Sequence, residues 1–216
     1  MTSTVVHVCR HGQVENPDHI LYGRAEGYGL SALGHQMAAA LGEHFADVPL
    51  AHLRCSPLQR AQETIAPIAA AHPELEIVTD HRVIEAENLL EGQSFGRFNQ
   101  RLALPKNLRY LWNPLLPSWG EPYRDVATRM RAAIADAAVA AGEGGQAAIV
   151  AHQLPIFIAR LAAEGRSFVH NPITRECRLA SVTSFHFHGP RVVKVSYAEP
   201  ADHLYPPKAR IFRPGM

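Results

Sequence analysis

The stretch Val5-Val6-His7-Val8-Cys9-Arg10-His11-Gly12 decides how the rest of the chain is interpreted. Its apolar, β-branched residues are typical of a buried strand, and this pattern stops abruptly at Arg10-His11-Gly12. A guanidinium and an imidazole therefore lie where a buried strand is expected to reach a loop at the surface. Charge at that position is unusual, and it marks this end of the strand as a candidate site.

The composition is that of a globular chain without a strong charge bias. The chain has 216 residues, a formal net charge of +1 and a sequence pI near 7.9. A chain of this length suits one large α/β domain, and we expect a single domain over residues 1–216. The balanced charge argues against an extended surface for nucleic acid or membrane, so any anion site must be local.

The cysteines and the N-terminus both favour a cytoplasmic protein. Cys9, Cys55 and Cys177 are odd in number and have no CxxC spacing, which argues against a disulfide framework and a zinc cluster. The N-terminus lacks a basic segment followed by an apolar one, and no apolar run approaches the ~20 residues that span a bilayer. We therefore expect a cytoplasmic protein with neither a membrane nor a nucleic-acid partner. The oligomeric state stays open.

Further strands and helices alternate along the chain. Ser31 can cap a helix, and Ser56-Pro57 predicts the N-cap and first residue of another helix, with Arg60 in its first turn. Pro67 is expected to kink or end that second helix. The predicted strands are residues 51–55, 76–79 and 147–151, the other predicted helices are 123–141 and 156–163, and residues 181–186 and 192–197 are predicted to form an antiparallel hairpin.

This alternation predicts an α/β fold. We expect a three-layer sandwich, with a mostly parallel central sheet, helices on both faces and the C-terminal hairpin as antiparallel edge strands. Residues 92–120 have poor periodicity but contain aromatic side chains, which favours an ordered insert that covers the site. The chain ends in a Pro-rich basic tail, 199–216. Its residues Lys208-Ala209-Arg210, Phe212 and Arg213 are interpreted as a solvated terminus, with folding over the site or over a partner as the alternative.

Charged residues follow three of the predicted strands. Arg10 and His11 follow the first strand, Arg60 lies just after the second, and His152 follows the strand 147–151. Ligands bind at the carboxyl ends of the strands in folds of this class, so these four side chains are expected to converge. Arginine matches phosphate oxygens, and a neutral imidazole nitrogen can carry a phosphoryl group covalently. The convergence therefore predicts a phosphoryl-group site.

The sequence also resembles a known family, the histidine phosphatase superfamily, also called phosphoglycerate mutase-like. The matching elements, in chain order, are Arg10-His11-Gly12, Tyr22-Gly23-Arg24, Gly29-Leu30-Ser31 with Gly34, Ser56-Pro57 with Arg60, Arg82-Val83-Ile84-Glu85 with Glu91-Gly92, and Ala151-His152. Three letters alone would be a weak signal. Spaced elements in the same order over roughly the whole chain make the resemblance specific.

The resemblance implies roles for the residues that match its motifs. It places the phosphorylated nucleophile on His11 and the phosphate-pocket partners on Arg10, Arg60 and His152. It implies a reaction that needs neither a metal nor a cofactor, on a phosphorylated small molecule.

The same resemblance places the proton donor on Glu85. A carboxyl that protonates the leaving alcohol and then activates water needs a pKa raised by partial burial. Glu87 is the alternative, because spacing does not distinguish two carboxylates two residues apart in a loop.

Three further residues are candidate substrate contacts. Asn16 lies one position nearer to Arg10-His11-Gly12 than its counterpart in the family, and Arg24 is a loop cation. Gln153 stands where the family usually has a small or Gly-rich sequence, so its side chain or backbone amide is expected to contribute instead.

We interpret the chain as a phosphatase that hydrolyses a phosphomonoester through phospho-His11. A mutase, which hands the phosphoryl group back, is the first alternative. The segment after Gly92 lacks the paired basic residues associated with mutases, although it contains scattered basic residues. A non-catalytic phospho-ligand binding protein is the second alternative, and the presence of both histidines and both arginines argues against it.

Overall fold

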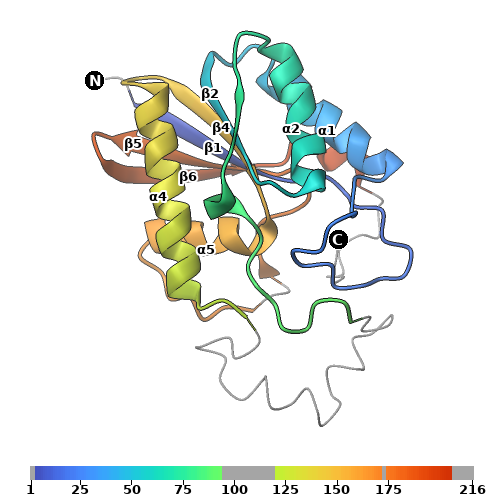
Figure 1. Ribbon diagram of the computed structural model, residues 1–216. Helices are drawn as coiled ribbons and strands as arrows, with labels where there is room; N and C mark the ends of the chain where they lie inside the picture. The colour runs from blue at the N-terminus through green and yellow to red at the C-terminus, as the bar shows by residue number, and fades with distance from the viewer. Residues whose placement is uncertain (1–2, 94–119, 172–173, 206–216) are drawn as a thin grey trace.

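A computed structural model describes residues 3–93, 120–171 and 174–205 (Figure 1). Its centre is a six-stranded sheet with the strand order β3-β2-β4-β1-β5-β6. The strands are β1 (Thr4–Arg10), β2 (Leu50–Cys55), β3 (Ile77–Thr79), β4 (Gln146–Ala151), β5 (Val182–His188) and β6 (Arg191–Ala198). The predicted strands are therefore confirmed, with small differences at their ends.

The sheet is mostly parallel. Neighbouring pairs among β3, β2, β4 and β1 are parallel, whereas β5 pairs antiparallel with β1, and β6 antiparallel with β5. The predicted C-terminal hairpin is therefore confirmed. Because Arg10 pairs with Ala151 in the register, β1 and β4 end side by side.

Helices cover both faces of the sheet, as Figure 1 shows, which confirms the predicted layers. One face packs against α1 (Ala32–Phe45) and α2 (Gln59–Ala71), and the other against α4 (Tyr123–Ala141) and α5 (Gln153–Ala163). Two short 3-10 helices span His81–Val83 and Asp202–Leu204. None of the described helices is both long and apolar enough to cross a bilayer.

The strand β4 shows how the two cores are built. Ala147, Ile149 and Ala151 belong to the core under α4 and α5, whereas Ala148 and Val150 belong to the core under α1 and α2. All five side chains are fully buried, because successive side chains of a central strand alternate between two covered faces. A continuous apolar run therefore marks a strand buried on both faces.

The structure corrects two details of the sequence prediction for α2: its N-cap residue, and the helix end predicted at Pro67 as the alternative to a kink. The helix begins at Gln59, after an N-cap residue, Leu58, that makes no side-chain capping bond, so Ser56 is not the N-cap. The helix also continues through Pro67 to Ala71, so this proline does not end it. Pro67 packs closely on Gly42 of α1, where an added Cβ would come within 2.9 Å of the Pro67 Cβ. Tertiary packing between the two helices therefore outweighs the local effect of proline.

Two other predictions concern segments at the limits of the described residues. The predicted helix 156–163 begins earlier, at Gln153. Most of the predicted covering insert 92–120 lies outside the described residues, as does the tail beyond Tyr205.

Candidate active site

Three neighbouring strand ends bring the central side chains together. His11 follows β1 and its backbone N–H donates to the Ala151 carbonyl at 3.2 Å, so the β1–β4 pairing continues up to His11. His152 follows β4, and its ring centroid lies 5.2 Å from that of His11. Ser56 follows β2 and donates its N–H to the Val150 carbonyl at 3.0 Å. The predicted convergence of the two histidines is therefore present.

The His11 ring is held in one tautomer. Its Nδ1 lies 2.8 Å from the Gly12 carbonyl, and since a carbonyl only accepts, Nδ1 must carry the proton. The other nitrogen, Nε2, then keeps its lone pair. Burial lowers the pKa of His11 well below its ordinary value, and the positive charges of Arg60 and Arg10 lower it further. The His11 ring is therefore neutral near pH 7, with Nε2 unprotonated.

The loop after His11 is fixed by close backbone packing. The Gly12 N–H donates to the Thr64 hydroxyl at 3.0 Å, and this hydroxyl donates to the Arg60 carbonyl at 2.6 Å. A Cβ at Gly12 would lie 2.6 Å from the Gly34 carbonyl oxygen, closer than such atoms approach. The glycine in the motif therefore lets the backbone turn tightly between α1 and α2.

His152 presents one bonded and one unpartnered nitrogen. Its Nε2 lies 2.7 Å from the Ser56 hydroxyl, and that hydroxyl also accepts the Leu58 N–H at 3.4 Å. Its Nδ1 is buried and has no hydrogen-bond partner among the described residues. Burial lowers the pKa of His152 well below its ordinary value, and Arg60, His11 and Arg10 lower it further.

Two guanidinium groups complete this cluster of side chains. Arg60 is 1% exposed; its Nη2 donates to the Gly23 carbonyl at 2.6 Å, and its guanidinium carbon lies 4.6 Å from the centre of the Tyr22 ring. Its Nε is buried with no partner within the described part of the chain. Arg10 is also buried, and its Nη1 donates to the Cys177 carbonyl at 2.9 Å. Buried positive charge with an unused donor is the environment that an anion would satisfy.

The two candidate carboxylates lie in different environments. Glu85 follows the 3-10 helix and is partly buried, and burial raises its pKa, although Arg60 and Arg10 favour its charged form. Its Oε1 accepts the Ala86 N–H at 2.9 Å. The side chain of Glu87 is 71% exposed and contacts Arg24 at 3.3 Å. Of the two, Glu85 has the environment of a proton donor.

The three candidate substrate contacts have partners within the protein. Both side-chain amide atoms of Asn16 bond to the backbone of Ile20, which closes their own loop. Arg24 donates to the Glu85 carbonyl, and Gln153 donates to the Cys177 carbonyl at 3.3 Å. Their role as substrate contacts stays a prediction.

Sequence reasoning missed three residues at the site. Thr64 lies four positions after Arg60 on the same helix, so helical spacing could have indicated it. Tyr22 lies in a quoted motif, but nothing in the sequence indicates its stacking on Arg60. Arg175 acts electrostatically on Glu85, and no pattern in the sequence points to it.

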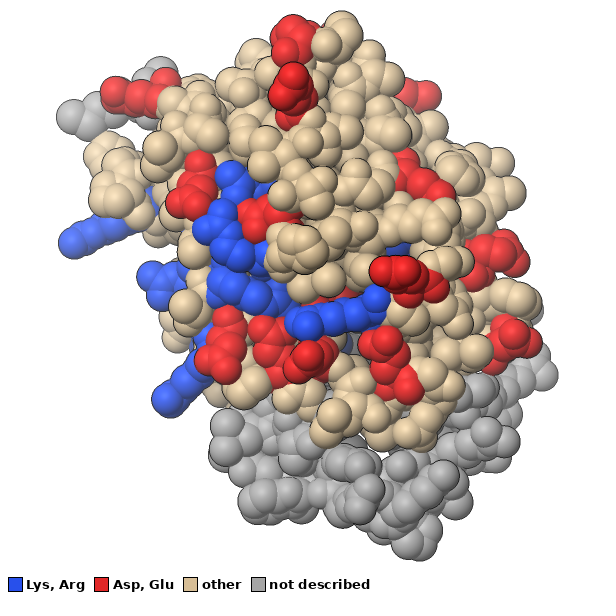
Figure 2. Space-filling model, viewed as in Figure 1, with Lys and Arg blue, Asp and Glu red and all other residues tan. Residues whose placement is uncertain are grey.

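The surface of the molecule carries charges of both signs. On the face in Figure 2, Lys and Arg side chains lie directly beside Asp and Glu side chains, which agrees with the small net charge. Among the described residues, no group of three His, Cys, Asp or Glu side chains could hold a metal ion.

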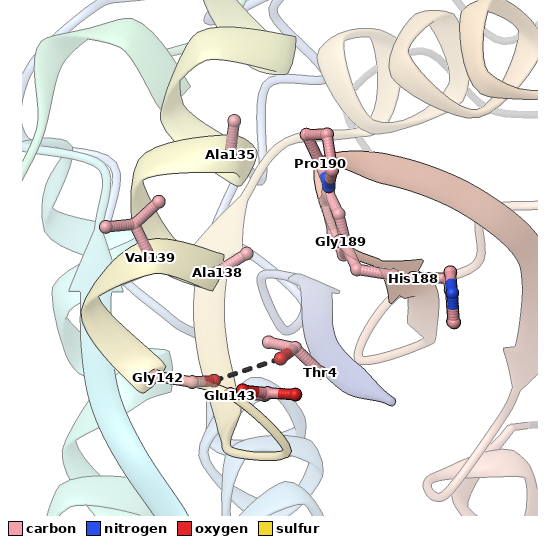
Figure 3. A pocket seen from close by; sticks show the side chains of 10 residues that line it. Thr4, Ala135, Ala138, Val139, Gly142, Glu143, His188, Gly189 and Pro190 are labelled. Atoms are coloured by element: carbon pink, nitrogen blue, oxygen red, sulfur yellow. Dashed lines mark hydrogen bonds between the residues drawn. The ribbon is translucent and has the colours of Figure 1, made fainter. Parts of the chain in front are cut away.

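A separate hollow of about 570 Å³ lies between α4 and the β5–β6 turn (Figure 3). The hydroxyl of Thr4, at the start of β1, donates there to the Gly142 carbonyl at 2.9 Å. His11 follows the other end of the same strand, so this hollow is not part of the candidate site.

Comparison with known proteins agrees with this geometry. The family description "Histidine phosphatase superfamily (branch 1)" matches residues 6–200, which is most of the chain. The chain belongs to the histidine phosphatase superfamily. The matched residues of this histidine phosphatase superfamily protein include His11, His152, Arg10, Arg60 and Glu85.

The sequence similarity of this histidine phosphatase superfamily protein to a curated relative extends over nearly its whole length. Rv0525 of Mycobacterium tuberculosis (strain H37Rv) is 48% identical over 198 residues, which cover 92% of this chain and 97% of that protein. Two solved structures share the fold at lower identity. The mycobacterial glucosyl-3-phosphoglycerate phosphatase Rv2419c has a TM-score of 0.70 and 22% identity, covering 91% of this chain and 98% of the other. The phosphoglycerate mutase from Bacillus anthracis has a TM-score of 0.71 and 19% identity, covering 94% and 96%.

Proposed function

We propose that the protein is a phosphatase that hydrolyses a small-molecule phosphomonoester through a phosphohistidine on His11. The observation that carries this proposal is the hydrogen bond from His11 Nδ1 to the Gly12 carbonyl, which leaves the Nε2 lone pair for attack on phosphorus. The lowered pKa of His11 keeps that lone pair unprotonated at neutral pH.

The proposed reaction has two displacements. His11 Nε2 attacks phosphorus and the bond to the leaving oxygen breaks, while Glu85 gives its proton to that oxygen. The alcohol departs, and Glu85, now a carboxylate, takes a proton from water as the water oxygen attacks phospho-His11. The nitrogen–phosphorus bond breaks, inorganic phosphate leaves, and both side chains return to their starting state.

The two arginines and His152 would stabilise the charge that develops on the phosphoryl oxygens. The unpartnered Arg60 Nε is a buried donor, and the unpartnered His152 Nδ1 is a second one when it carries a proton; fixed groups of this kind need little reorganisation during the reaction. A bound phosphoryl dianion would also favour protonation of His152, which would add a third positive charge.

A mutase would use the same pocket, and fold similarity does not separate the two activities, since a phosphatase and a mutase match this fold equally well. The proposal of hydrolysis rests on the segment after Gly92. Its basic residues, Arg97, Arg101, Lys106 and Arg109, are scattered and not paired. The buried free thiols of all three cysteines support the further proposal that the protein acts in the cytoplasm.

The first prediction tests this function directly. The wild-type protein should release phosphate from p-nitrophenyl phosphate, should hydrolyse 3-phosphoglycerate without isomerising it, and should be unaffected by a chelator. His11→Ala should lower kcat/KM on the order of 10⁴-fold or more, because the nucleophile is lost. Radiolabelled substrate should leave an acid-labile, base-stable phosphoryl group on the wild type and none on this variant.

A matched control is His72→Ala, which removes a buried histidine that bonds to the Phe45 carbonyl away from the site. It should retain the activity even if it melts earlier. Isomerisation of 3-phosphoglycerate in place of hydrolysis would identify a mutase. Binding of phosphate without turnover would identify a binding protein.

A further inference from the structure

We propose that Arg24, Glu121 and Arg129 form a clamp that positions Glu85 for proton transfer. The proposal rests on the function proposed above and assigns positioning residues to it. None of the three is expected to touch the substrate through this role. They act on the backbone of residues 82–87, the segment that carries the carboxyl group.

This segment needs partners for its carbonyl groups. Beyond the 3-10 helix it belongs to no helix or strand of the sheet, so its carbonyls lack the bonds that regular structure supplies. Arg129, from the middle of α4, donates through a single nitrogen, Nη1, to the carbonyls of Arg82 and Ile84, both at 2.7 Å. One guanidinium thus holds the backbone immediately before Glu85.

A second guanidinium holds Glu85 itself. Arg24, in the loop that follows the His11 motif, donates from Nε to the Glu85 carbonyl at 2.7 Å. Its backbone N–H donates to the Glu91 carboxylate at 2.8 Å, which fixes the position of Arg24. Arg24 therefore links the loop after the nucleophile to the residue proposed as its acid.

Glu121 joins the two arginines into one unit. Its Oε1 lies 2.7 Å from Arg129 Nε, and its Oε2 lies 2.9 Å from Arg129 Nη2 and 3.0 Å from Arg24 Nη2. The side chains of Glu121 and Arg129 are each only 15% exposed, and Arg24 is 29% exposed. Partly buried, bidentate pairs of this kind fix geometry better than exposed single pairs.

The backbone of Glu121 also takes part. Its N–H donates to the Glu87 carbonyl at 3.1 Å, and an added Cβ at the preceding Gly120 would overlap that same carbonyl oxygen. The segment is therefore held on both sides of Glu85. Arginine side chains bond to the carbonyls of Arg82, Ile84 and Glu85, and the Glu121 backbone bonds to the Glu87 carbonyl.

The chemical consequence follows from the geometry that proton transfer requires. A general acid must lie within hydrogen-bond reach of the leaving oxygen, and a shift of about 1 Å can cost on the order of 10²-fold in rate. Loss of the clamp should therefore impair only the step that needs the Glu85 proton, while the phosphate pocket stays intact.

Two leaving groups separate positioning from general damage. The kcat/KM value reports the first displacement, which needs the proton for an alkyl phosphate but hardly for p-nitrophenyl phosphate. Glu121→Gln and Arg129→Lys should lower kcat/KM for an alkyl phosphate about 10- to 100-fold, and should change the value for p-nitrophenyl phosphate about threefold or less.

The matched controls lie at the C-terminal end of α5, where Glu164 is the cap residue. Arg160 and Glu164 form an ion pair of similar burial, 16% and 23% exposed, that does not touch residues 82–87. Arg160→Lys and Glu164→Gln should leave both kcat/KM values near those of the wild type. An equal loss with both substrates in the clamp variants, or no loss with either, would overturn the proposal.

A second readout does not depend on turnover. The Glu85 carboxyl carbon, labelled with carbon-13, can be titrated by NMR in the wild type and in Glu121→Gln. Loosening of the segment should admit water and move the Glu85 titration toward that of an ordinary glutamate, with no such shift in Glu164→Gln. An unchanged titration would contradict the clamp. Absence of any phosphatase activity in the wild type would instead contradict the proposed function, whatever the titration shows.

Discussion

Glu85 and His11 have opposite pKa shifts with a shared cause. Burial disfavours the charged form of each group, which raises the pKa of the carboxyl and lowers the pKa of the imidazole. Each shift favours the protonation state that the proposed first step requires, a neutral nucleophile and a protonated acid. One desolvated pocket can thus prepare both groups at the same pH.

The second prediction concerns the identity and pH dependence of the acid. Glu85→Gln should lower kcat/KM for an alkyl phosphate about 10²- to 10⁴-fold, whereas Glu87→Gln should change it little, because an exposed carboxylate contributes weakly. In the wild type, kcat/KM for the alkyl phosphate relative to p-nitrophenyl phosphate should fall as the pH rises through the raised pKa of Glu85.

This fall with rising pH should be absent from Glu85→Gln and present in Glu87→Gln. An alkyl and an aryl phosphate lose their second proton at different pH values, so each profile should first be corrected for the ionisation of its own substrate. Equal effects of the two substitutions, or a persistent fall with rising pH in Glu85→Gln, would move the proton donor to another residue.

At the scale of elements, the N-terminal part of α1 positions the loop that carries His11. Gly34, in the first turn of α1, faces the backbone of Gln13, and an added Cβ would overlap the Gln13 carbonyl. Gly42, two turns later, instead faces Pro67 of α2. Helix propensity alone would favour alanine at both positions by about 1 kcal/mol.

The third prediction contrasts these two helical glycines. Gly34→Ala should lower the free energy of unfolding by about 1–3 kcal/mol through overpacking and should abolish most activity, because the loop next to His11 must move. In Gly42→Ala, overpacking against Pro67 should cancel the stability gained from the higher helix propensity of alanine. This variant should keep its activity. Thermal melting and phosphate release distinguish them, and full activity in Gly34→Ala would refute this role of α1.

At the scale of the whole molecule, buried histidines couple stability to pH. Full or partial burial is the first cause of a lowered pKa at a set of histidines on several elements, namely His7, His11, His52, His152, His170 and His186. In the unfolded chain these groups take up protons below about pH 6.5, while the folded chain resists protonation until a lower pH. Folding stability should therefore fall as the pH drops below that value.

The fourth prediction measures this effect. The melting temperature should fall between pH 6.5 and pH 5.5, and each fully buried histidine contributes at most about 1.4 kcal/mol per pH unit. The raised pKa of Glu85 opposes this fall in stability, because Glu85 takes up its proton at a higher pH in the folded chain than in the unfolded chain. His11→Gln should reduce the fall, whereas His35→Gln, which changes an exposed histidine, should retain it. A melting temperature that does not change with pH would contradict the prediction.

The order of strands and helices could be read from the sequence because each depends on local patterns. The helix cap at Ser31 shows this: the Gly34 N–H donates to its hydroxyl at 3.0 Å, a bond between residues three positions apart. The positions of Arg10, His11 and His152 at strand ends, and of Arg60 in the first turn of α2, follow from the same local periodicity, combined with the general rule that sites lie at the carboxyl edge of a parallel sheet.

Only the tertiary structure decided which of several similar groups performs each task. Ser56 has the same capping chemistry as Ser31, but its hydroxyl bonds to His152, 96 positions away in the sequence. Glu85 and Glu87 are equivalent by spacing, and they differ because burial and Arg10 and Arg60 act on one of them. Hydrogen bonds and desolvation between distant segments have no local signature in the sequence. The sequence by itself therefore determined which chemical groups lie at this edge of the sheet, and the tertiary structure decided which of them is suited to each task.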